Sequence, residues 1–178
     1  MPKVIKNSKI VDEESVVLPE GLRTDLQDPT TIKTLTTTDE NGVPHTVHKH
    51  SMMLTEDGCL AYIELLEGSQ TSKNMLKNNW SKNFVGVTSY NPGNGNSFQI
   101  KGIAYKYLVE GPIWEKMLKM TWEMFPTVEP CGVWLIIPKD VRDETYEGRF
   151  REEDERLKPS HHQWFAYKDA SYGRRHKK

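Results

Sequence analysis

The sequence predicts a mainly β fold, an antiparallel barrel of six strands with helices that cover it. Three observations lead to this class. Short runs rich in β-branched and apolar residues recur between Ile32 and Pro138. Asn-Gly and Asp-Gly turns separate the first of these runs, and such turns join antiparallel neighbours. Two segments between the later runs carry helix signals instead, which suits covers on a curled sheet.

The first three strands are defined by the turns between them. Ile32–Thr38 is rich in β-branched residues and ends at Asp39-Glu-Asn-Gly42, a strong hairpin signal. Val43–Leu54 is the second strand, and Thr55-Glu-Asp-Gly58 leads from it into a third, Cys59–Leu66. Two consecutive hairpins of this kind predict a three-stranded meander.

A short helix and a fourth strand follow the meander. Hydroxyl side chains at the start of 71–79 are typical of a helix N-terminus, so a helix is predicted there. Phe84–Tyr90 is again apolar and β-branched and predicts the fourth strand. Asn91–Asn96 alternates asparagine with glycine and proline, which predicts a loop.

Ser97–Glu110 is a long fifth strand with a change of phase. Phe98 and Ile100 share one face, whereas Ile103 and the apolar residues after it share the other. The change falls at Gly102, where a β-bulge would reset the alternation. A bulge at this position would help the sheet to curl into a barrel.

The second helix and the sixth strand complete the predicted barrel. Pro112 suits a helix start, and apolar residues then recur at three-to-four spacing up to Phe125. This pattern predicts a helix over 113–125 that faces the core, with a ligand lid as the alternative. Gly132–Pro138 is apolar throughout and predicts a buried sixth strand that contains Trp134.

The segments outside the barrel are charged or lack a clear period. We expect one helical turn around Gly21–Leu26, a solvated helix face at Arg149–Arg156, and a tail from His161 that is loose or covers a neighbouring subunit's site. The predicted divisions are an N-terminal arm, a barrel domain and a charged C-terminal extension, at 1–28, 29–147 and 148–178.

Composition limits the classes of function. With 36% apolar and 28% charged residues, the 178-residue chain is long enough for one domain with its own core. A net charge of -1 argues against nucleic-acid binding as the main task. No run has the length or apolar character of a signal peptide or membrane span. Cys59 and Cys131 lie in apolar segments, so we expect buried thiols and cytoplasmic residence.

Ser69-Gln-Thr-Ser-Lys73 stands where the predicted third strand ends and a short helix begins. Exposed backbone N–H groups, hydroxyls and a lysine can converge there on one anion, and a phosphate suits that arrangement. An N-cap with a surface lysine explains the same residues without a ligand. The segment is not a P-loop, because the glycines and the Gly-Lys-Ser/Thr order are missing.

Val47–Met52 carries polar side chains on both faces of a predicted strand. His48 and His50 point to one side, with Met52 and Leu54, and Lys49 points to the other. One face is therefore free to meet a ligand or a second subunit. His48 and His50 could form half of a metal site, but no third ligand stands at a suitable spacing, so we expect no metal.

The order of these elements resembles the pyridoxamine 5′-phosphate oxidase-like FMN-binding split-barrel superfamily. The resemblance covers residues 30–146, about two-thirds of the chain, and depends on several short motifs in sequence order. They are Leu35–Thr38, Gly42, Pro44–Leu54, Asp57-Gly58, Leu60–Tyr62, Ser72-Lys73, Leu76–Asn79, Phe84–Thr88, Gln99–Ala104, Val133–Pro138 and Val141–Tyr146. The family's phosphate pair is typically Arg-Lys, whereas Ser72-Lys73 stands here.

The resemblance implies a homodimer with FMN at the subunit interface. It places the phosphate near Thr71, Ser72 and Lys73, and it places the ring and ribityl chain along two strands. The residues implied there are Val47, His48, Lys49, His50 and Ser51 on one strand, and Tyr62 and Ile63 on the next. Gln99, or Ser97 if the register differs, would reach the ring from the other subunit.

The implied function is an FMN-dependent oxidoreductase that transfers a hydride or electrons to or from a small molecule, with NAD(P)H as a candidate reductant. Lys49 would favour the anionic reduced flavin by its charge. His50 is the candidate acid–base residue, since imidazole titrates near neutrality. Two alternatives stay open: a non-catalytic FMN-binding or electron-carrier protein, and a haem-binding or haem-degrading split barrel with His161 or His162 as axial ligand.

Overall fold

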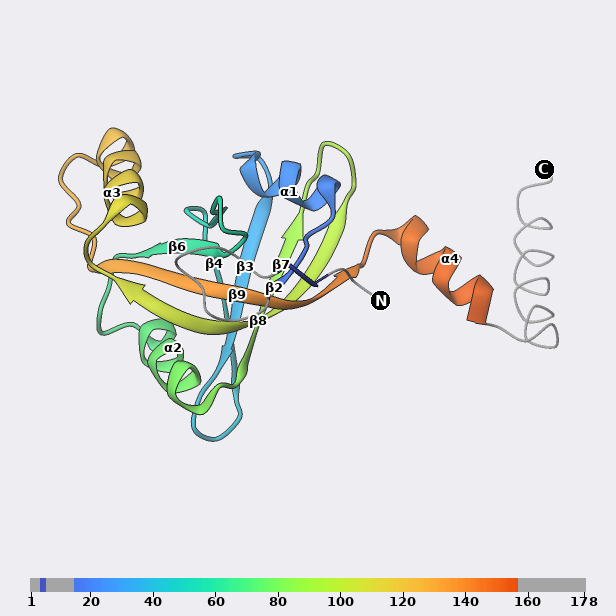
Figure 1. Cartoon of the computed structure of the whole chain (residues 1–178), viewed down its shortest axis with the longest axis horizontal. Helices are drawn as coiled ribbons and strands as arrows, with labels where there is room; N and C mark the ends of the chain where they lie inside the picture. The colour runs from blue at the N-terminus through green and yellow to red at the C-terminus, as the bar shows by residue number, and fades with distance from the viewer. Residues whose placement is uncertain (1–3, 6–14, 157–178) are drawn as a thin grey trace, which may run out of the picture. The chain divides into compact units, whose positions relative to one another are not determined.

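The computed structural model describes residues 4–5 and 15–156 (Figure 1). The chain divides between Arg142 and Asp143 into two compact units, and each is described by itself. The first unit contains the sheets and three helices. The second contains the helix α4, Tyr146–Arg156.

Seven strands form one mainly antiparallel sheet, in the order β4-β3-β7-β8-β9-β6-β5. Their bounds are β3 (Ile32–Thr38), β4 (Pro44–His48), β5 (Met53–Leu54), β6 (Leu60–Glu64), β7 (Phe84–Tyr90), β8 (Ser97–Leu108) and β9 (Gly132–Asp143). The short strands β1 (Val4–Ile5) and β2 (Ser15–Val16) pair separately. The three helices are α1 (Glu20–Gln27), α2 (Gln70–Ser81) and α3 (Pro112–Met124).

The prediction of six strands is wrong because Val43–Leu54 is not continuous. It forms β4 and β5, and residues 49–52 turn between them. The amide of Lys49 still bonds to the Lys33 carbonyl at 2.9 Å, but Met52 then turns back and donates to the Lys49 carbonyl at 3.0 Å. The predicted sharing of one face by His48, His50, Met52 and Leu54 fails for the same reason. Both histidines are exposed, and Met52 and Leu54 are buried.

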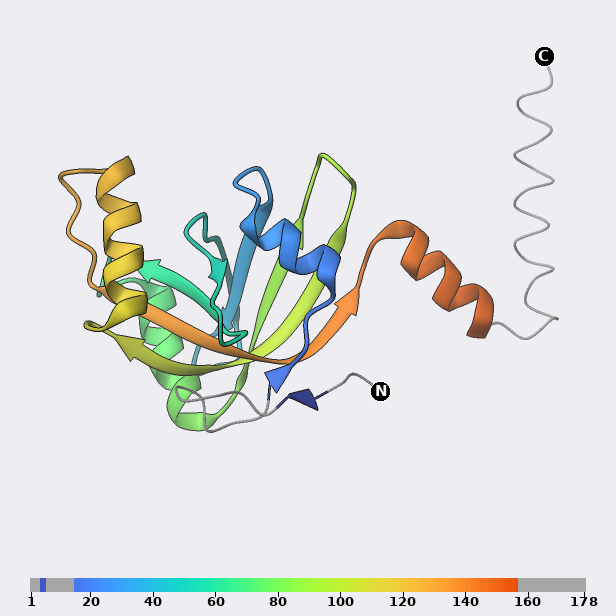
Figure 2. The ribbon, with the colours of Figure 1, turned by 45° about the horizontal axis from the view of Figure 1, so that its top comes forward.

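The break also changes the topology from the predicted meander. β3 pairs with β4 and β5 pairs with β6, as expected for two hairpins. β4 and β5, however, are the two edges of the sheet. Because only four residues connect these edges, the sheet must curl until they lie near each other, which gives a barrel with a split (Figure 2).

Gly102 marks a close approach between strands and not the predicted bulge in pairing with β7. The register of β7 with β8 runs without interruption from Phe84↔Ile103 to Tyr90↔Ser97. Phe98, Ile100, Gly102 and Ala104 are all buried, so the phase does not change at the glycine. A Cβ on Gly102 would lie 2.5 Å from Ile136 Cγ2 and 2.8 Å from the Ile137 carbonyl oxygen. Only glycine admits β9 at this distance.

The main core fills the curled sheet and is closed by helices. Leu35, Tyr62, Ile100, Trp134 and Ile136 are fully or almost fully buried, which confirms Trp134 as a core residue. Helix α1 contacts β5 and β7, α2 contacts β8, β3 and β4, and α3 contacts β6. Figures 1 and 2 show the three helices at separate places around the sheet.

Helix α1 is longer than the single turn expected around Gly21–Leu26. Helix α1 has eight residues and buries Leu22 and Leu26 against the core. Its buried Asp25 accepts hydrogen bonds from three asparagine side chains of the loop between β7 and β8. These are Asn91 at 2.8 Å, Asn94 at 2.9 Å and Asn96 at 2.9 Å.

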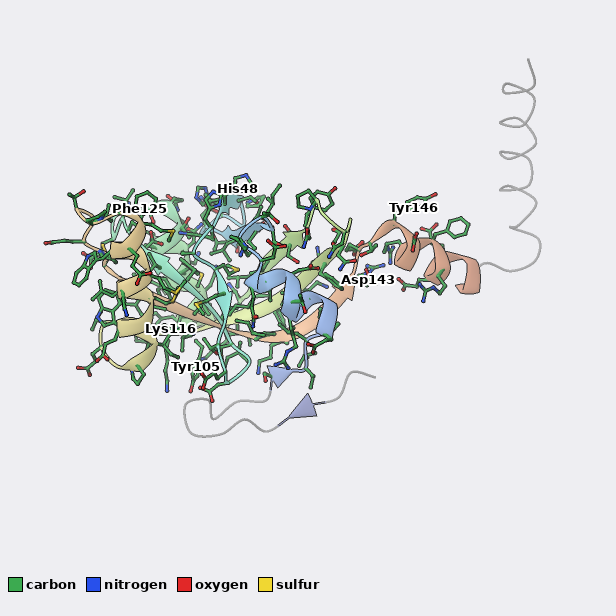
Figure 3. All side chains as sticks on the ribbon, turned by 90° about the horizontal axis from the view of Figure 1, so that it is seen from above. His48, Tyr105, Lys116, Phe125, Asp143 and Tyr146 are labelled. Carbon is green, nitrogen blue, oxygen red and sulfur yellow. The ribbon has the colours of Figure 1, made fainter. Side chains whose placement is uncertain are left out.

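Helix α3 faces the core, as predicted, but over a narrower stripe of residues. Met117 packs with Ala61 and Ile63 of β6, and Thr121 is also buried. Leu118 is half-buried, and four apolar side chains at the C-terminal end of the helix are exposed, including Phe125, which Figure 3 labels beside α3. They are Met120, Trp122, Met124 and Phe125. α3 therefore buries a narrower stripe than its sequence pattern suggests.

The second unit contains the charged helix expected near Arg149–Arg156. Arg149 pairs with Glu144 at 3.2 Å and with Glu152 one turn later. The second pair has i,i+3 spacing, so it lies along one face of the helix. The tail from His161 lies outside the described residues.

Gly102→Ala should destabilise the protein by about 1–3 kcal/mol, because the new methyl group must displace Ile136 or the β9 backbone. Gly86→Ala is the matched control in the neighbouring strand, since its Cβ would meet only Thr36 at an ordinary 3.7 Å. Urea unfolding of both variants measures the difference. Equal losses for the two glycines would contradict the close approach.

Candidate functional site

The turn between β4 and β5 is fixed by a buried ion pair. Lys49 Nζ lies 3.3 Å from Glu64 Oε2, with 13% and 4% of the two side chains exposed. The same ammonium lies 4.4 Å from the centroid of the Tyr62 ring, in cation–π geometry. Lys49 therefore extends from the turn towards β6, and its ammonium is held between the Glu64 carboxylate and the Tyr62 ring of that strand.

Ser51 fixes the other half of this turn. Its hydroxyl accepts a hydrogen bond from the Ile63 amide at 3.1 Å, which attaches the turn to β6. His48 and His50 flank Lys49 on the exposed side, with their rings stacked at 6.1 Å between centroids. Figure 3 shows the His48 side chain projecting outward from the sheet. The structure thus brings Lys49, Ser51 and Ile63 together and leaves both imidazoles on the surface.

Glu64 also connects the turn to the start of α2. Its Oε1 accepts from the Leu66 amide at 3.3 Å and from the Ser69 hydroxyl at 3.4 Å. Glu64 is not among the site residues predicted from the sequence. The signal available was a carboxylate at the end of an otherwise apolar strand, where a buried charge needs a partner.

The start of α2 has the predicted cap. Ser69 is the N-cap, and its hydroxyl accepts from the Ser72 amide at 3.0 Å. Thr71 and Ser72 are buried, whereas Lys73 is exposed. Helix, cap and surface lysine are therefore all present, and they lie next to Glu64 and the turn that contains Lys49.

The charges at this helix start fit an anion. The first turn of α2 contains no acidic residue, although acidic residues often stabilise that position. The negative charge of Glu64 is compensated by Lys49. Lys73 and the positive end of the helix dipole favour a phosphate-sized anion, whereas the exposed Glu67, two residues before the cap, is the one acid beside them in the sequence. The donor set therefore fits the phosphate of a cofactor such as FMN.

Beside the ion pair, the buried rings of Tyr62 and Trp134 form an aromatic group with the partly buried Tyr107. Tyr62 is opposite Trp134 across β6 and β9, and the Trp134 ring lies 5.0 Å from that of Tyr107. The hydroxyls of both tyrosines and the indole N–H have no hydrogen-bond partner among the described residues. Burial, and then the charge of Glu64, raises the pKa of Tyr62. Burial is also the main cause that raises the pKa of Tyr107 to about 12.

Gln99 and His48 lie in one row across four strands. Gln99 is opposite Thr88, Thr88 is opposite Thr34, and Thr34 is opposite His48. The Thr34 and Thr88 hydroxyls are hydrogen-bonded within this row. Since neighbouring strands are about 4.8 Å apart, Gln99 is roughly 14 Å from the β4 edge along the sheet. Within one chain, Gln99 is therefore distant from the Lys49 turn.

The remaining candidates are located as follows. Val47 is half-buried near the end of β4, and Cys59 is buried, whereas Cys131 is only partly buried. Across residues 4–5 and 15–156, no group of three or more His, Cys, Asp or Glu side chains could hold a metal ion. None of the helices in those residues is both long and apolar enough to span a membrane.

Comparison with solved structures identifies the fold. HupZ from Group A Streptococcus has a TM-score of 0.60 at 18% identity, over 73% of this chain and 96% of its own. An FMN-binding protein from Syntrophomonas wolfei has a TM-score of 0.57 at 12% identity, over 68% and 82%. A candidate pyridoxamine 5′-phosphate oxidase from Lactobacillus delbrueckii has a TM-score of 0.54 at 19% identity, over 70% and 93%.

The chain has the split-barrel fold of the pyridoxamine 5′-phosphate oxidase-like proteins. At these identities the likeness is one of fold. By sequence, no family model and no curated protein matches the chain. The split barrel expected from the order of motifs is thus confirmed, with seven strands in place of six.

Ser69→Ala should cost about 1 kcal/mol of stability, because the Ser72 amide loses its cap and Glu64 loses a donor. Ser81→Ala at the exposed end of the same helix is the control and should change stability by less than half of that. Denaturant unfolding compares the two. A larger loss from the Ser81 variant would argue against the cap.

Alkaline pH should destabilise the protein through its buried tyrosines. The folded-state pKa of Tyr107 is about 12, above its ordinary value of 10.0, so its contribution is complete below pH 10.0 and is lost as pH rises towards 12. Tyr107→Phe should lose less stability over that interval, because it has no phenol to ionise. Urea midpoints of both proteins at each end of the interval provide the measurement, and identical pH slopes would refute the assignment.

Proposed function

We propose that this protein is an FMN-dependent oxidoreductase that acts as a homodimer on a small molecule. The observation that carries the proposal is the start of α2. A capped helix N-terminus, an exposed Lys73 and a carboxylate neutralised by Lys49 meet there, in a fold shared with an FMN-binding protein. The free thiols of Cys59 and Cys131 agree with the cytoplasmic residence that the sequence predicts.

The phosphate would be held by Thr71, Ser72 and Lys73. Lys73 would supply the charge, and the first-turn amides and hydroxyls would supply hydrogen bonds. Val47, His48, Lys49, His50 and Ser51 would lie along the ring, and Tyr62 and Ile63 would lie along the ribityl chain. The attachment of Ser51 to Ile63 supports this pairing, because it holds the two segments side by side.

A second subunit would complete the site. Gln99 is distant from the Lys49 turn within one chain, so the partner's Gln99 is the one expected to reach the ring. Apolar side chains on the outer face of β3 and β7 support a contact between subunits. Ile32, Phe84 and Tyr90 are each between 43% and 56% exposed in the single chain.

When bound, FMN supplies hydride or electron transfer, and the protein supplies position, charge and exclusion of side reactions. Lys49 is held by Glu64 and Tyr62, so its ammonium does not have to reorganise to stabilise negative charge. His50 is exposed beside Lys49 and is the candidate to hold or deliver a proton. NAD(P)H is a candidate reductant from solution.

Experiment distinguishes this proposal from two alternative functions. A non-catalytic FMN-binding or electron-carrier protein would use the same site, and steady NAD(P)H oxidation with an added acceptor distinguishes it from an enzyme. A haem protein would use His161 or His162, which lie outside the described residues. The visible spectrum of the purified protein separates flavin from haem.

FMN binding should weaken by about 2–4 kcal/mol in Ser72→Ala/Lys73→Ala, because one charge-assisted and one neutral phosphate contact are lost. The matched control is Lys77→Ala/Ser81→Ala, which removes the same two residue types from the far end of α2. Fluorescence titration of the FMN-free proteins with FMN measures both affinities. Wild-type protein that fails to bind FMN, or equal losses in the two double variants, would overturn the proposal.

A further inference from the structure

Glu64 is the residue that joins the two parts of the candidate site. One carboxylate oxygen lies 3.3 Å from Lys49 Nζ, and the other accepts from the Leu66 amide and the Ser69 hydroxyl. Lys49 belongs to the turn expected along the ring, and Ser69 caps the helix expected at the phosphate. Both parts are therefore fixed relative to one side chain.

Because Glu64 is buried, its carboxylate requires the Lys49 ammonium as a partner. An isolated carboxylate that is 97% removed from solvent would be strongly unfavourable, and Lys49 provides the opposite charge that it requires. The Tyr62 ring on the other side of the ammonium restricts it further. If the Lys49 side chain turned outward into solvent, the buried Glu64 carboxylate would lose its oppositely charged partner. The position of the lysine therefore depends on the carboxylate.

We propose that Glu64 is a positioning residue that fixes the ammonium of Lys49 and thereby sets the net charge that the site presents to the flavin ring. This inference deepens the proposed function, on which it rests. With Glu64 ionised, the Lys49–Glu64 pair has no net charge. The flavin ring then faces an oriented ammonium whose charge is balanced by the carboxylate on the side away from the flavin. Without the carboxylate, the Lys49 ammonium keeps its contact with the Tyr62 ring but loses its counter-charge, so one uncompensated positive charge remains beside the flavin ring.

The sign of the effect follows from charge. Reduction makes the flavin more negative, so an additional positive charge favours the reduced form and an additional negative charge favours the oxidised form. Glu64→Gln should therefore bind reduced FMN more tightly relative to oxidised FMN, and Lys49→Gln should do the reverse. Lys49→Gln/Glu64→Gln restores neutrality and should lie near the wild type.

The first readout is the midpoint potential of bound FMN, which reports the ratio of affinities for its two forms. We expect that ratio to change by about tenfold in Glu64→Gln, which corresponds to about 30 mV for two electrons. Glu64→Asp keeps the charge and should return the ratio to within about threefold of wild type. Glu20→Gln removes the acid of the exposed Glu20–Arg23 pair on α1 and is the control, with no change expected. An unchanged potential in Glu64→Gln would overturn the inference.

The second readout needs no flavin. A buried, paired ammonium exchanges its protons slowly, so Lys49 should give a ¹H–¹⁵N signal in FMN-free protein that is absent from Lys49→Gln. Loss of that signal in Glu64→Gln, but not in Glu20→Gln, supports positioning, and its persistence overturns it. If wild-type protein binds no FMN, the proposed function fails, and this signal alone decides whether Glu64 fixes Lys49. If Glu64→Gln does not fold, the potential of the neutral double variant is compared with that of Lys49→Gln. These two proteins differ only in the Glu64 carboxylate, so the comparison tests its charge, and equal potentials would overturn the inference.

Discussion

The rest of the structure depends on closing a curled sheet across four residues. β4 and β5 are the two edges of the sheet, yet residues 49–52 alone connect them. Among the described residues, the backbone there bonds only Lys49 to β3 and Met52 to Lys49, and side-chain contacts attach the turn to β6. Lys49 pairs with Glu64, and Ser51 accepts from the Ile63 amide. Both contacts end on β6, and the split of the barrel is therefore also where polar groups gather.

The residues that hold the turn between β4 and β5 are therefore also residues of the candidate site. A buried ion pair adds little net stability when its loss of hydration is counted, but removing one partner leaves a costly unpaired charge. The Lys49–Glu64 pair thus acts more on geometry than on stability. Ser69 extends the same arrangement to α2, because its hydroxyl both caps the helix and contacts Glu64.

Local sequence patterns predict most of the helices and strands. They fail where contacts between residues distant in the sequence determine the structure. Phe84–Tyr90 has the bounds that its composition predicts, and α2 begins at the predicted cap. Val43–Leu54 reads as one strand because Glu64, the partner that bends it at Lys49, lies 15 residues away. Gly102 suggests a bulge because the approach of β9 leaves no mark on the sequence around it. The N-cap can be predicted from neighbouring residues, whereas the Lys49–Glu64 ion pair can be predicted only once the fold is known.

The asparagine-rich loop between β7 and β8 has a consequence for how that end of the barrel opens. Three of its side chains donate to the single carboxylate of Asp25 on α1. Neither segment can separate alone without leaving a buried charge or several amides unsatisfied. Loop and helix therefore form one cooperative unit, whose backbone amides exchange with solvent through a shared opening event and with a common free energy.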